Sequence, residues 1–290
     1  MPRLSPQQPP LVLLVLLVLL LAPSARAACP ITDATVVAAY VDTDGGVGTH
    51  SAAWTKRFFA WWAPGGGAPD AVAFFDRAAD LAGCRALATY DGLLLWVQPG
   101  GEADNQSTAL GPAGRDNILD FAASAHGHIY ATCAGWYYSA GTYWWFGDFF
   151  PRAWMPHWWP TVEGPISAIA VYPLYAPAAL SNGLTAIYYG GPCMGCANTS
   201  SALPPGAEAL AYFDMPGVPK DTPAMVRYRG EYINAFFSSP HPEATSDDLT
   251  CAPPLPPGCI TPEQQLANWQ FIAATLNEMM GTDFPVPTKL

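Results

Sequence analysis

The sequence predicts an α/β domain with an open, mostly parallel β-sheet flanked by helices. Short apolar runs at residues 34–41, 71–75, 93–97 and 128–132 are typical of buried strands. Stretches with apolar residues at helical spacing stand between them, at 51–62, 76–88 and 115–125. Such alternation of strand and helix favours a sheet with helices on its faces.

The first strand and helix are separated by a glycine-rich loop. Residues 34–41 form a β-branched apolar run, and the polar loop 42–49 follows at the carboxyl end of this strand. Helical spacing begins at residue 51, with Ser51 or Thr49 as the expected N-cap.

Two further strands end in residues that can carry chemistry. The fully apolar run 93–97 is followed closely by Gly100 and Gly101. Strand 128–132 is followed at once by Cys133, and residues 134–145 continue as an expected helix. Ligands of open α/β sheets bind beyond the carboxyl ends of the strands, so this edge is the expected site.

The second half of the chain is less regular. Short strands are expected at 166–172, 185–189, 208–213, 225–229 and 234–238. Residues 262–280 predict a long terminal helix, with Thr261 as N-cap and Gly281 as its stop. No segment has the composition of an interdomain linker, so residues 28–290 are interpreted as one domain.

Residues 1–27 have the features of a secretory signal peptide. Arg3 precedes an unbroken apolar run at 11–22, and small residues follow at 24–27. An uncleaved membrane anchor is the alternative, although the apolar run is short for a span. The expected location is therefore extracellular or the lumen of the secretory pathway, with no membrane contact after cleavage.

Cleavage would leave a strongly acidic protein. The remaining chain has 10 basic and 23 acidic residues, a net charge of −13. Such a surface repels phosphate backbones, so no nucleic acid partner is expected.

Seven cysteines are an odd number for a secreted chain. The expected disulfide pairs are Cys193 with Cys196, Cys251 with Cys259, and Cys29 with Cys84. This pairing would leave Cys133 as a thiol, either buried or in use. Half of a zinc ribbon is the alternative for Cys193-Met-Gly-Cys196, but no second Cys or His pair has matching spacing, so neither a metal nor a cofactor is expected.

Cys133 lies at a predicted strand-to-helix turn of small residues, Cys133-Ala134-Gly135. Such a turn exposes a nucleophile, and a helix amino terminus stabilises a thiolate. The N–H groups of Ala134 and of Gly100 or Gly101 would bind an oxyanion. A buried structural thiol is the alternative interpretation of Cys133.

His241 and Glu243 follow the last expected strand. Alternation around Pro242 places both side chains on one side of an extended segment. His241 can then take a thiol proton while Glu243 holds its tautomer. The alternative is an ordinary surface loop.

Several motifs occur in an order that resembles a known family. They occupy residues 90–92, 98–101, 114–121, 133–137, 187–192, 210–212, 223–226 and 239–243. Over roughly residues 34–243 the chain resembles the biotin-protein ligase amino-terminal domain family, within the class I glutamine amidotransferase-like superfamily. The resemblance implies a flavodoxin-like fold, a Cys133-His241-Glu243 triad and an oxyanion loop at 99–101. The chain departs from the superfamily at Ala131, where a glycine is usual, and from its protease-like branch at Ala134, where that branch has a histidine.

Two features have no role in this triad. In residues 136–159, 12 of 24 side chains are aromatic, which indicates either a wall of the site or a packed flap. Asn105 and Asn198 begin glycosylation sequons. His50 and His157 have no persuasive partners in the sequence. His126 and His128 flank Gly127 before the strand at 128–132, where either an approach to the site or an ordinary position at a loop and strand end explains them.

These residues predict a secreted thiol-dependent amidase or hydrolase acting on a small-molecule or peptide amide. Cys133 would attack the acyl carbon, His241 would transfer the proton and water would release the thioester. The alternative hypothesis is a non-catalytic binding or accessory module that retains the fold. The sequence does not determine the oligomeric state.

Overall fold

The structure, a computed structural model, describes residues 28–140, 163–171, 184–189, 191–193, 203, 205–214, 218–230, 233–247 and 260–290. Several predictions lie outside these residues: the signal peptide at 1–27, most of the aromatic segment 136–159, His157, Cys196, Asn198, Cys251 and Cys259.

Nine strands of the described chain form one sheet in the order β2-β1-β3-β4-β9-β8-β7-β5-β6. Strands β2, β1, β3, β4 and β9 pair in parallel. Strands β8, β7, β5 and β6 extend the sheet with antiparallel pairs. The bounds are β1 Val37–Tyr40, β2 Val72–Phe75, β3 Leu95–Gln98, β4 His128–Thr132, β5 Glu163–Val171, β6 Leu184–Tyr189, β7 Ala207–Asp214, β8 Pro223–Arg229 and β9 Asn234–Ser238.

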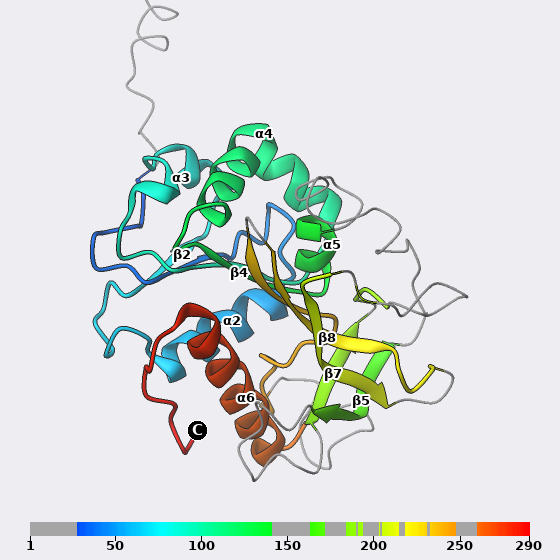
Figure 1. The fold of residues 1–290 in the computed structure, drawn as a ribbon. Helices are drawn as coiled ribbons and strands as arrows, with labels where there is room; N and C mark the ends of the chain where they lie inside the picture. Colours follow the sequence, from blue (N-terminus) through cyan, green and yellow to red (C-terminus); the bar gives the residue numbers. More distant parts are fainter. Residues whose placement is uncertain are drawn as a thin grey trace, which may run out of the picture.

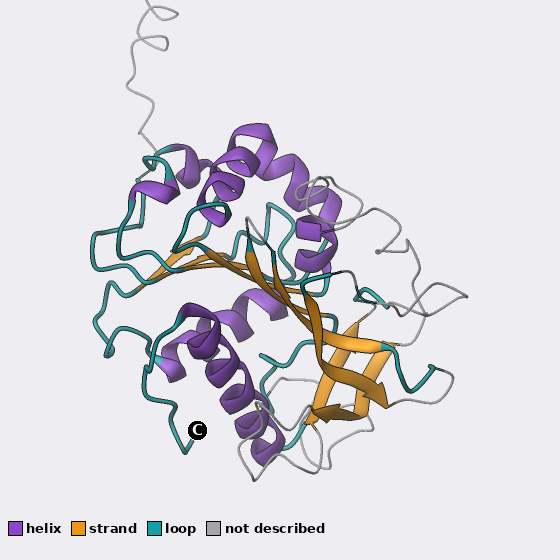
Figure 2. Cartoon of the chain, viewed as in Figure 1, coloured by secondary structure: helices purple, strands orange, loops and turns teal. Residues whose placement is uncertain are grey.

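Helices cover both faces of the parallel part of the sheet (Figures 1 and 2). Helices α3, α4 and α5 lie on one face, and α2 and the terminal α6 lie on the other. Their bounds are α2 Thr49–Trp62, α3 Ala78–Ala82, α4 Ala103–Ala122, α5 Ala134–Ala140 and α6 Pro262–Met280, with a short 3-10 helix at Leu87–Thr89. The predicted α/β sheet flanked by helices is confirmed.

The parallel strands are buried because helices exclude water from both of their faces. All four residues of β1 and all five of β4 are buried. Aromatic rings fill the space beneath them, with Tyr130 stacked on Phe236 at 5.1 Å between ring centroids. Because β3, β4 and β9 pair in parallel, their carboxyl ends lie at the same edge of the sheet, and this packing holds them there.

Helix α6 has the predicted terminal signals. The Thr261 hydroxyl accepts from the Gln264 N–H at 3.2 Å, and the Gln264 side chain accepts from the Thr261 N–H at 2.8 Å. This reciprocal pair is a capping box. Gly281, in the left-handed region at φ 66°, ends the helix.

Two helix starts differ from the prediction. The N-cap of α2 is Gly48, so neither Thr49 nor Ser51 caps this helix. Helix α4 consists of two helical segments that meet at Gly111, whose backbone is not helical at φ 60° and ψ −175°, so a further segment from Ala103 precedes the helix predicted at 115–125. Pro112 begins the second segment, where a missing N–H costs no helical hydrogen bond.

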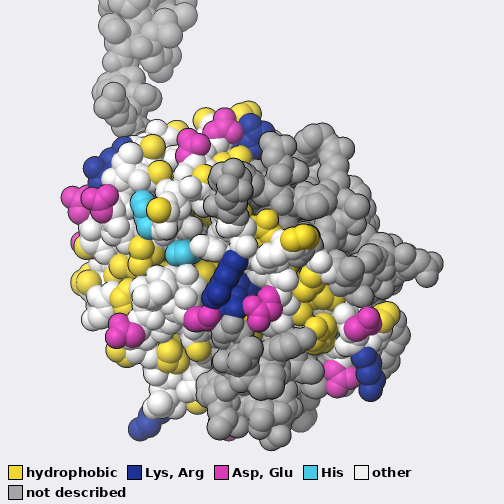
Figure 3. All heavy atoms as spheres, viewed as in Figure 1, with side chains coloured by type: hydrophobic (Ala, Val, Ile, Leu, Met, Phe, Trp, Pro, Cys, Tyr) yellow, Lys and Arg dark blue, Asp and Glu magenta, His cyan; other side chains and the backbone are white. Residues whose placement is uncertain are grey.

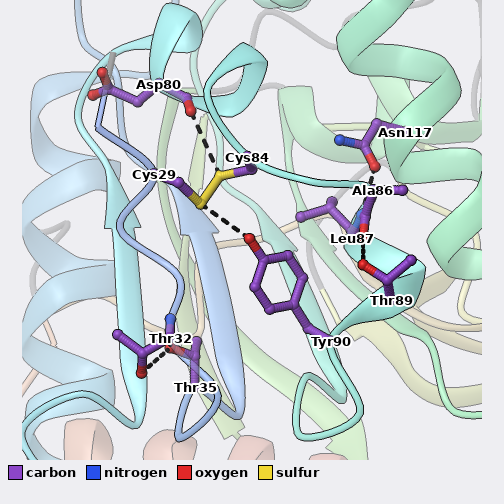
Figure 4. The surroundings of a disulfide bond; sticks show 10 residues. All are labelled: Cys29, Thr32, Thr35, Asp80, Cys84, Ala86, Leu87, Thr89, Tyr90 and Asn117. Atoms are coloured by element: carbon purple, nitrogen blue, oxygen red, sulfur yellow. Dashed lines mark hydrogen bonds between the residues drawn. A yellow bond between two sulfur atoms is a disulfide. The ribbon is translucent and has the colours of Figure 1, made fainter. Parts of the chain in front are cut away.

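A disulfide joins Cys29 to Cys84, as predicted, and so ties the segment before β1 to the end of α3 (Figure 4). The Tyr90 hydroxyl donates to the Cys29 sulfur at 3.4 Å. Cys193 is also disulfide-bonded, with its partner outside the described residues.

Among the described residues on the face shown in Figure 3, the Lys and Arg side chains at the centre lie next to acidic ones. A long, apolar helix of the kind that spans a bilayer is not found in the part of the chain that the structure describes.

Candidate active site

Cys133 occupies a sharp turn between β4 and α5. Its φ of 50° lies in the left-handed region, which is uncommon for a residue other than glycine. A left-handed φ strains the backbone of such a residue, and it persists only where the surrounding structure imposes it. Residues strained in this way are enriched at active sites. Here the Cys133 N–H donates to the Ser238 carbonyl at 2.8 Å. The predicted elbow therefore forms, although residue 131 is alanine.

Gly135 allows this turn to approach strand β3. A Cβ at Gly135 would overlap the carbonyl oxygen of Gln98 and lie 2.9 Å from that of Pro99. Glycine is therefore required two residues after Cys133, where the chain passes against the end of β3.

His241 and Glu243 extend from the segment after β9 toward this turn. The His241 Nδ1 and the Glu243 Oε1 are 3.0 Å apart, and both side chains are buried. The His241 N–H donates to the Ile187 carbonyl at 2.7 Å, which anchors the loop to β6. The pair is therefore part of the interior rather than an ordinary surface loop.

Besides His241, two neighbours hold Glu243 in place by hydrogen bonds. The Thr132 hydroxyl donates to Glu243 Oε1 at 3.0 Å. The Trp269 indole N–H donates to the Glu243 carbonyl at 3.0 Å, so helix α6 also supports the loop. Burial, together with the negative charge of Glu243, raises the pKa of Tyr130 well above its ordinary value.

The pKa of His241 depends on both acidic neighbours. Burial by itself lowers this pKa, but the negative charges of Cys133 and Glu243 and hydrogen bonds to both side chains outweigh it and raise the pKa to about 10. The site therefore favours a protonated His241 imidazole beside Cys133 and Glu243, an arrangement that suits proton transfer at a thiol.

Trp54 of α2 supports the imidazole from another side. Its ring meets the His241 ring edge-on, with 5.4 Å between centroids. His50 in turn lies 5.7 Å from Trp54, centroid to centroid. The sequence carries no signal for this role of Trp54, because a tryptophan on the apolar side of a predicted helix looks like any core residue.

Residues 99–101 form the loop that the sequence predicts as an oxyanion loop. A Cβ at Gly100 would overlap the Cε1 atom of His241 and lie 3.1 Å from the Cβ of Cys133, so this loop faces the thiol. Among the described residues, the N–H groups of Gly101 and Ala134 donate to no backbone carbonyl. They are therefore available for a ligand.

A buried amide network holds this loop. The Trp96 indole N–H donates to Gln98 at 2.9 Å, and the Gln98 amide donates to Gln106 at 2.9 Å. The Gln106 amide donates in turn to the Pro99 carbonyl at 3.1 Å. Gln106 is the middle residue of a glycosylation sequon, so the sequence indicates an exposed position and not this buried one. Asn105, the sequon's acceptor, is exposed.

The remaining histidine pair lies elsewhere. His128 begins β4, at the opposite end of that strand from Cys133. Burial lowers the pKa of His128 to about 4, with a further contribution from the positive charge of His126. No cluster of potential metal ligands is found within the described ranges.

Neither a family model nor a curated protein sequence matches this chain. Among solved structures, a glutamine amidotransferase matches with a TM-score of 0.50 and 15% sequence identity. This match covers 85% of this chain and 100% of the other. The chain has the class I glutamine amidotransferase-like fold.

Two more solved structures align with lower scores. A protein described as a GMP synthase subunit, from Thermoplasma acidophilum, has a TM-score of 0.44 and 14% identity over 85% of this chain and 98% of its own. A β-galactosidase from Bacillus circulans sp. alkalophilus has a TM-score of 0.46 and 10% identity, and the match covers 87% of this chain but 32% of that enzyme. At such identities the amidotransferase-like description applies to the fold.

Proposed function

We propose that this protein is a thiol-dependent amidase or hydrolase that uses Cys133, His241 and Glu243. The observation that carries the proposal is the strained Cys133 at φ 50°, beside a buried imidazole that is bonded to a carboxylate. Backbone strain of this kind clusters at active sites, whereas a cysteine that only fills the core can adopt an unstrained conformation.

In the proposed reaction the Cys133 sulfur attacks the carbonyl carbon of an amide. The N–H groups of Gly101 and Ala134 stabilise the oxyanion, and the His241 imidazolium protonates the leaving nitrogen. Neutral His241 then takes a proton from water, whose oxygen attacks the thioester. The acid is released and the thiol returns, so no other reactant is consumed.

Glu243 has a positioning role in this scheme. Its hydrogen bond to Nδ1 directs the other ring nitrogen of His241 toward the thiol, and its charge stabilises the imidazolium. Thr132 holds the carboxylate at 3.0 Å for the same purpose.

Three finer proposals concern the family, the location and the partner of this protein. The ordered sequence motifs support kinship with the biotin-protein ligase amino-terminal domain family. Residues 1–27 and the disulfide between Cys29 and Cys84 support secretion, since disulfides persist in oxidising compartments. An acidic surface supports a small amide or peptide as partner rather than nucleic acid.

A non-catalytic binding module is the second candidate. The burial of the site favours it, because Cys133 is 5% exposed and His241 is 3% exposed. In that case the thiol would be a structural part of the interior.

Alkylation with iodoacetamide near neutral pH separates the two functions. In the native protein, an activated Cys133 reacts with iodoacetamide faster than the thiol of glutathione does. His241→Ala should slow the reaction of Cys133 by about tenfold or more, because the thiol loses its acid–base partner. His128→Ala, at the opposite end of β4, is the matched control and retains the rate. Labelling that begins only after denaturation would establish a structural thiol, and hydrolysis of glutamine, γ-glutamyl peptides and simple amides then tests turnover.

A further inference from the structure

The two oxygens of the Glu243 carboxylate differ in their surroundings. Oε1 has two hydrogen-bond partners, the Thr132 hydroxyl at 3.0 Å and the His241 Nδ1 at 3.0 Å. Oε2 is buried and has no hydrogen-bond partner among the described residues. A carboxylate oxygen that has lost its water without gaining a donor raises the free energy of the charged form, so native proteins usually provide a donor.

Tyr130 carries a donor that also lacks a partner. Its side chain is 1% exposed, and its hydroxyl is buried without a hydrogen bond to any residue that the structure describes. Tyr130 lies two residues before Thr132 on β4, and side chains two apart on a strand point to the same face of the sheet. Because Thr132 already donates to Glu243, Tyr130 faces the side on which this carboxylate lies.

The Tyr130 ring is fixed in place, and its hydroxyl stays protonated. The ring stacks on Phe236, and Phe236 in turn meets Phe271 of α6 edge-on, with 6.4 Å between ring centroids. Burial raises the pKa of Tyr130 well above its ordinary value, and the negative charge of Glu243 raises this pKa further. The phenol is therefore a neutral donor that experiences the charge of the carboxylate.

We propose that Tyr130 is a positioning residue of the candidate site, whose hydroxyl donates to Glu243 Oε2 and holds the carboxylate against His241. A carboxylate turns about its terminal bond at little cost, and one water with both groups as partners makes the same link. A hydrogen bond to the carboxylate favours its charged form, which in turn stabilises the His241 imidazolium. The inference rests on the proposed function, since Tyr130 acts on the thiol only through Glu243 and His241.

Tyr130→Phe tests this role, because it removes the hydroxyl and retains the ring that packs on Phe236. Without the donor the charged form of Glu243 is less stable, so the His241 imidazolium is less favoured and Cys133 ionises at higher pH. The midpoint of the iodoacetamide labelling rate against pH should rise by about one unit, the effect of one hydrogen bond to a charged group. A tyrosine that only fills the core would leave this midpoint unchanged.

Tyr138→Phe is the matched control. Tyr138 is also fully buried, and it lies on α5, on the face of the sheet opposite α6 (Figure 1). This variant should retain the wild-type midpoint.

Glu243→Gln provides a second comparison. Adding Tyr130→Phe to it should not move the midpoint further, because the hydroxyl acts through the carboxylate. An unchanged midpoint in folded Tyr130→Phe, or an equal shift with and without Glu243→Gln, overturns the positioning role.

Proton magnetic resonance of the wild-type protein gives a test that needs neither the Tyr130→Phe variant nor thiol chemistry. A buried hydroxyl that donates to a carboxylate exchanges slowly with water, and this strong hydrogen bond gives its proton a separate downfield resonance. The resonance should move in Glu243→Gln, because a neutral amide oxygen accepts a weaker hydrogen bond. Its absence from the wild type, or an unchanged position in Glu243→Gln, overturns the bond between Tyr130 and Glu243.

The two measurements separate this inference from the proposed hydrolase. If iodoacetamide does not label native wild-type protein, the hydrolase fails, and the hydroxyl resonance then decides whether Tyr130 holds Glu243. If the wild type is labelled but its midpoint does not respond to Tyr130→Phe, the hydrolase stands and the positioning role fails.

Discussion

Gly100 lies where three side chains of the candidate site come together, and these leave no room for a side chain of its own. The space that a Cβ would occupy is bounded by the His241 ring, the Ser51 hydroxyl and the Cys133 side chain. Gly101 has φ 149° and lies against the Gly46 carbonyl, so it too requires glycine. The position of both glycines directly after a predicted strand marks them in the sequence.

Gly100→Ala should displace His241. Because the new methyl group overlaps Cε1, the imidazole must move away from the thiol, and iodoacetamide labelling of Cys133 should fall by about tenfold. Overpacking of this kind should also cost about 1–3 kcal/mol of unfolding free energy, measured in urea.

Gly114→Ala in α4 is the control, since its Cβ would meet only side chains, the nearest atom at 3.2 Å. It should retain the labelling rate. Fast labelling of folded Gly100→Ala would mean that His241 does not activate the thiol.

A disulfide connects the segment before β1 to the residues that follow α3 (Figure 4). Cys29 and Cys84 are separated by 55 residues, so their bond shortens a long loop of the unfolded chain. The Arg85 guanidinium also lies 4.0 Å from the Tyr90 ring centroid, next to the same link.

Removal of this disulfide should destabilise the protein without altering the site. A closed loop of this length is worth about 4 kcal/mol by chain entropy, so Cys29→Ser with Cys84→Ser should lower the free energy of unfolding by about that amount. Urea unfolding measures the loss. The iodoacetamide rate of the folded variant should match the wild type, and a loss below about 1 kcal/mol would show that the link constrains little.

The whole sheet brings together residues that are far apart in sequence. Strands β4 and β9 pair in parallel, with Thr132 opposite Ser238, so Cys133 and His241 leave the sheet at one edge. The antiparallel extension beyond β9 adds the contact between Ile187 and His241. The protonation of His241 is thus a property of the folded molecule.

Stability should therefore depend on pH through His241. Its pKa rises from about 6.5 in the unfolded chain to about 10 in the folded protein, so protonation favours the folded state. The contribution is complete below pH 6.5 and is lost as pH rises toward 10. Between pH 6 and 10 the wild-type melting temperature should fall more than that of His241→Gln, and parallel curves would contradict the raised pKa.

The order of elements and the chemistry-bearing residues follow from local sequence. Apolar runs mark the strands, and Thr261 and Gly281 mark the ends of α6, because these signals act between neighbours in the chain. Cys133, His241, Glu243, Gly100 and Gly101 could be named for the same reason.

Other features were decided only by tertiary structure. The start of α2 at Thr49 leaves the Ser51 hydroxyl beside Gly100, and the Cys133 turn at φ 50° lies where its N–H donates to the Ser238 carbonyl. Trp54 and Thr132 join the site through pairing between distant strands and helices. Such contacts depend on which segments pack together, and a pattern within one segment carries no record of its partner.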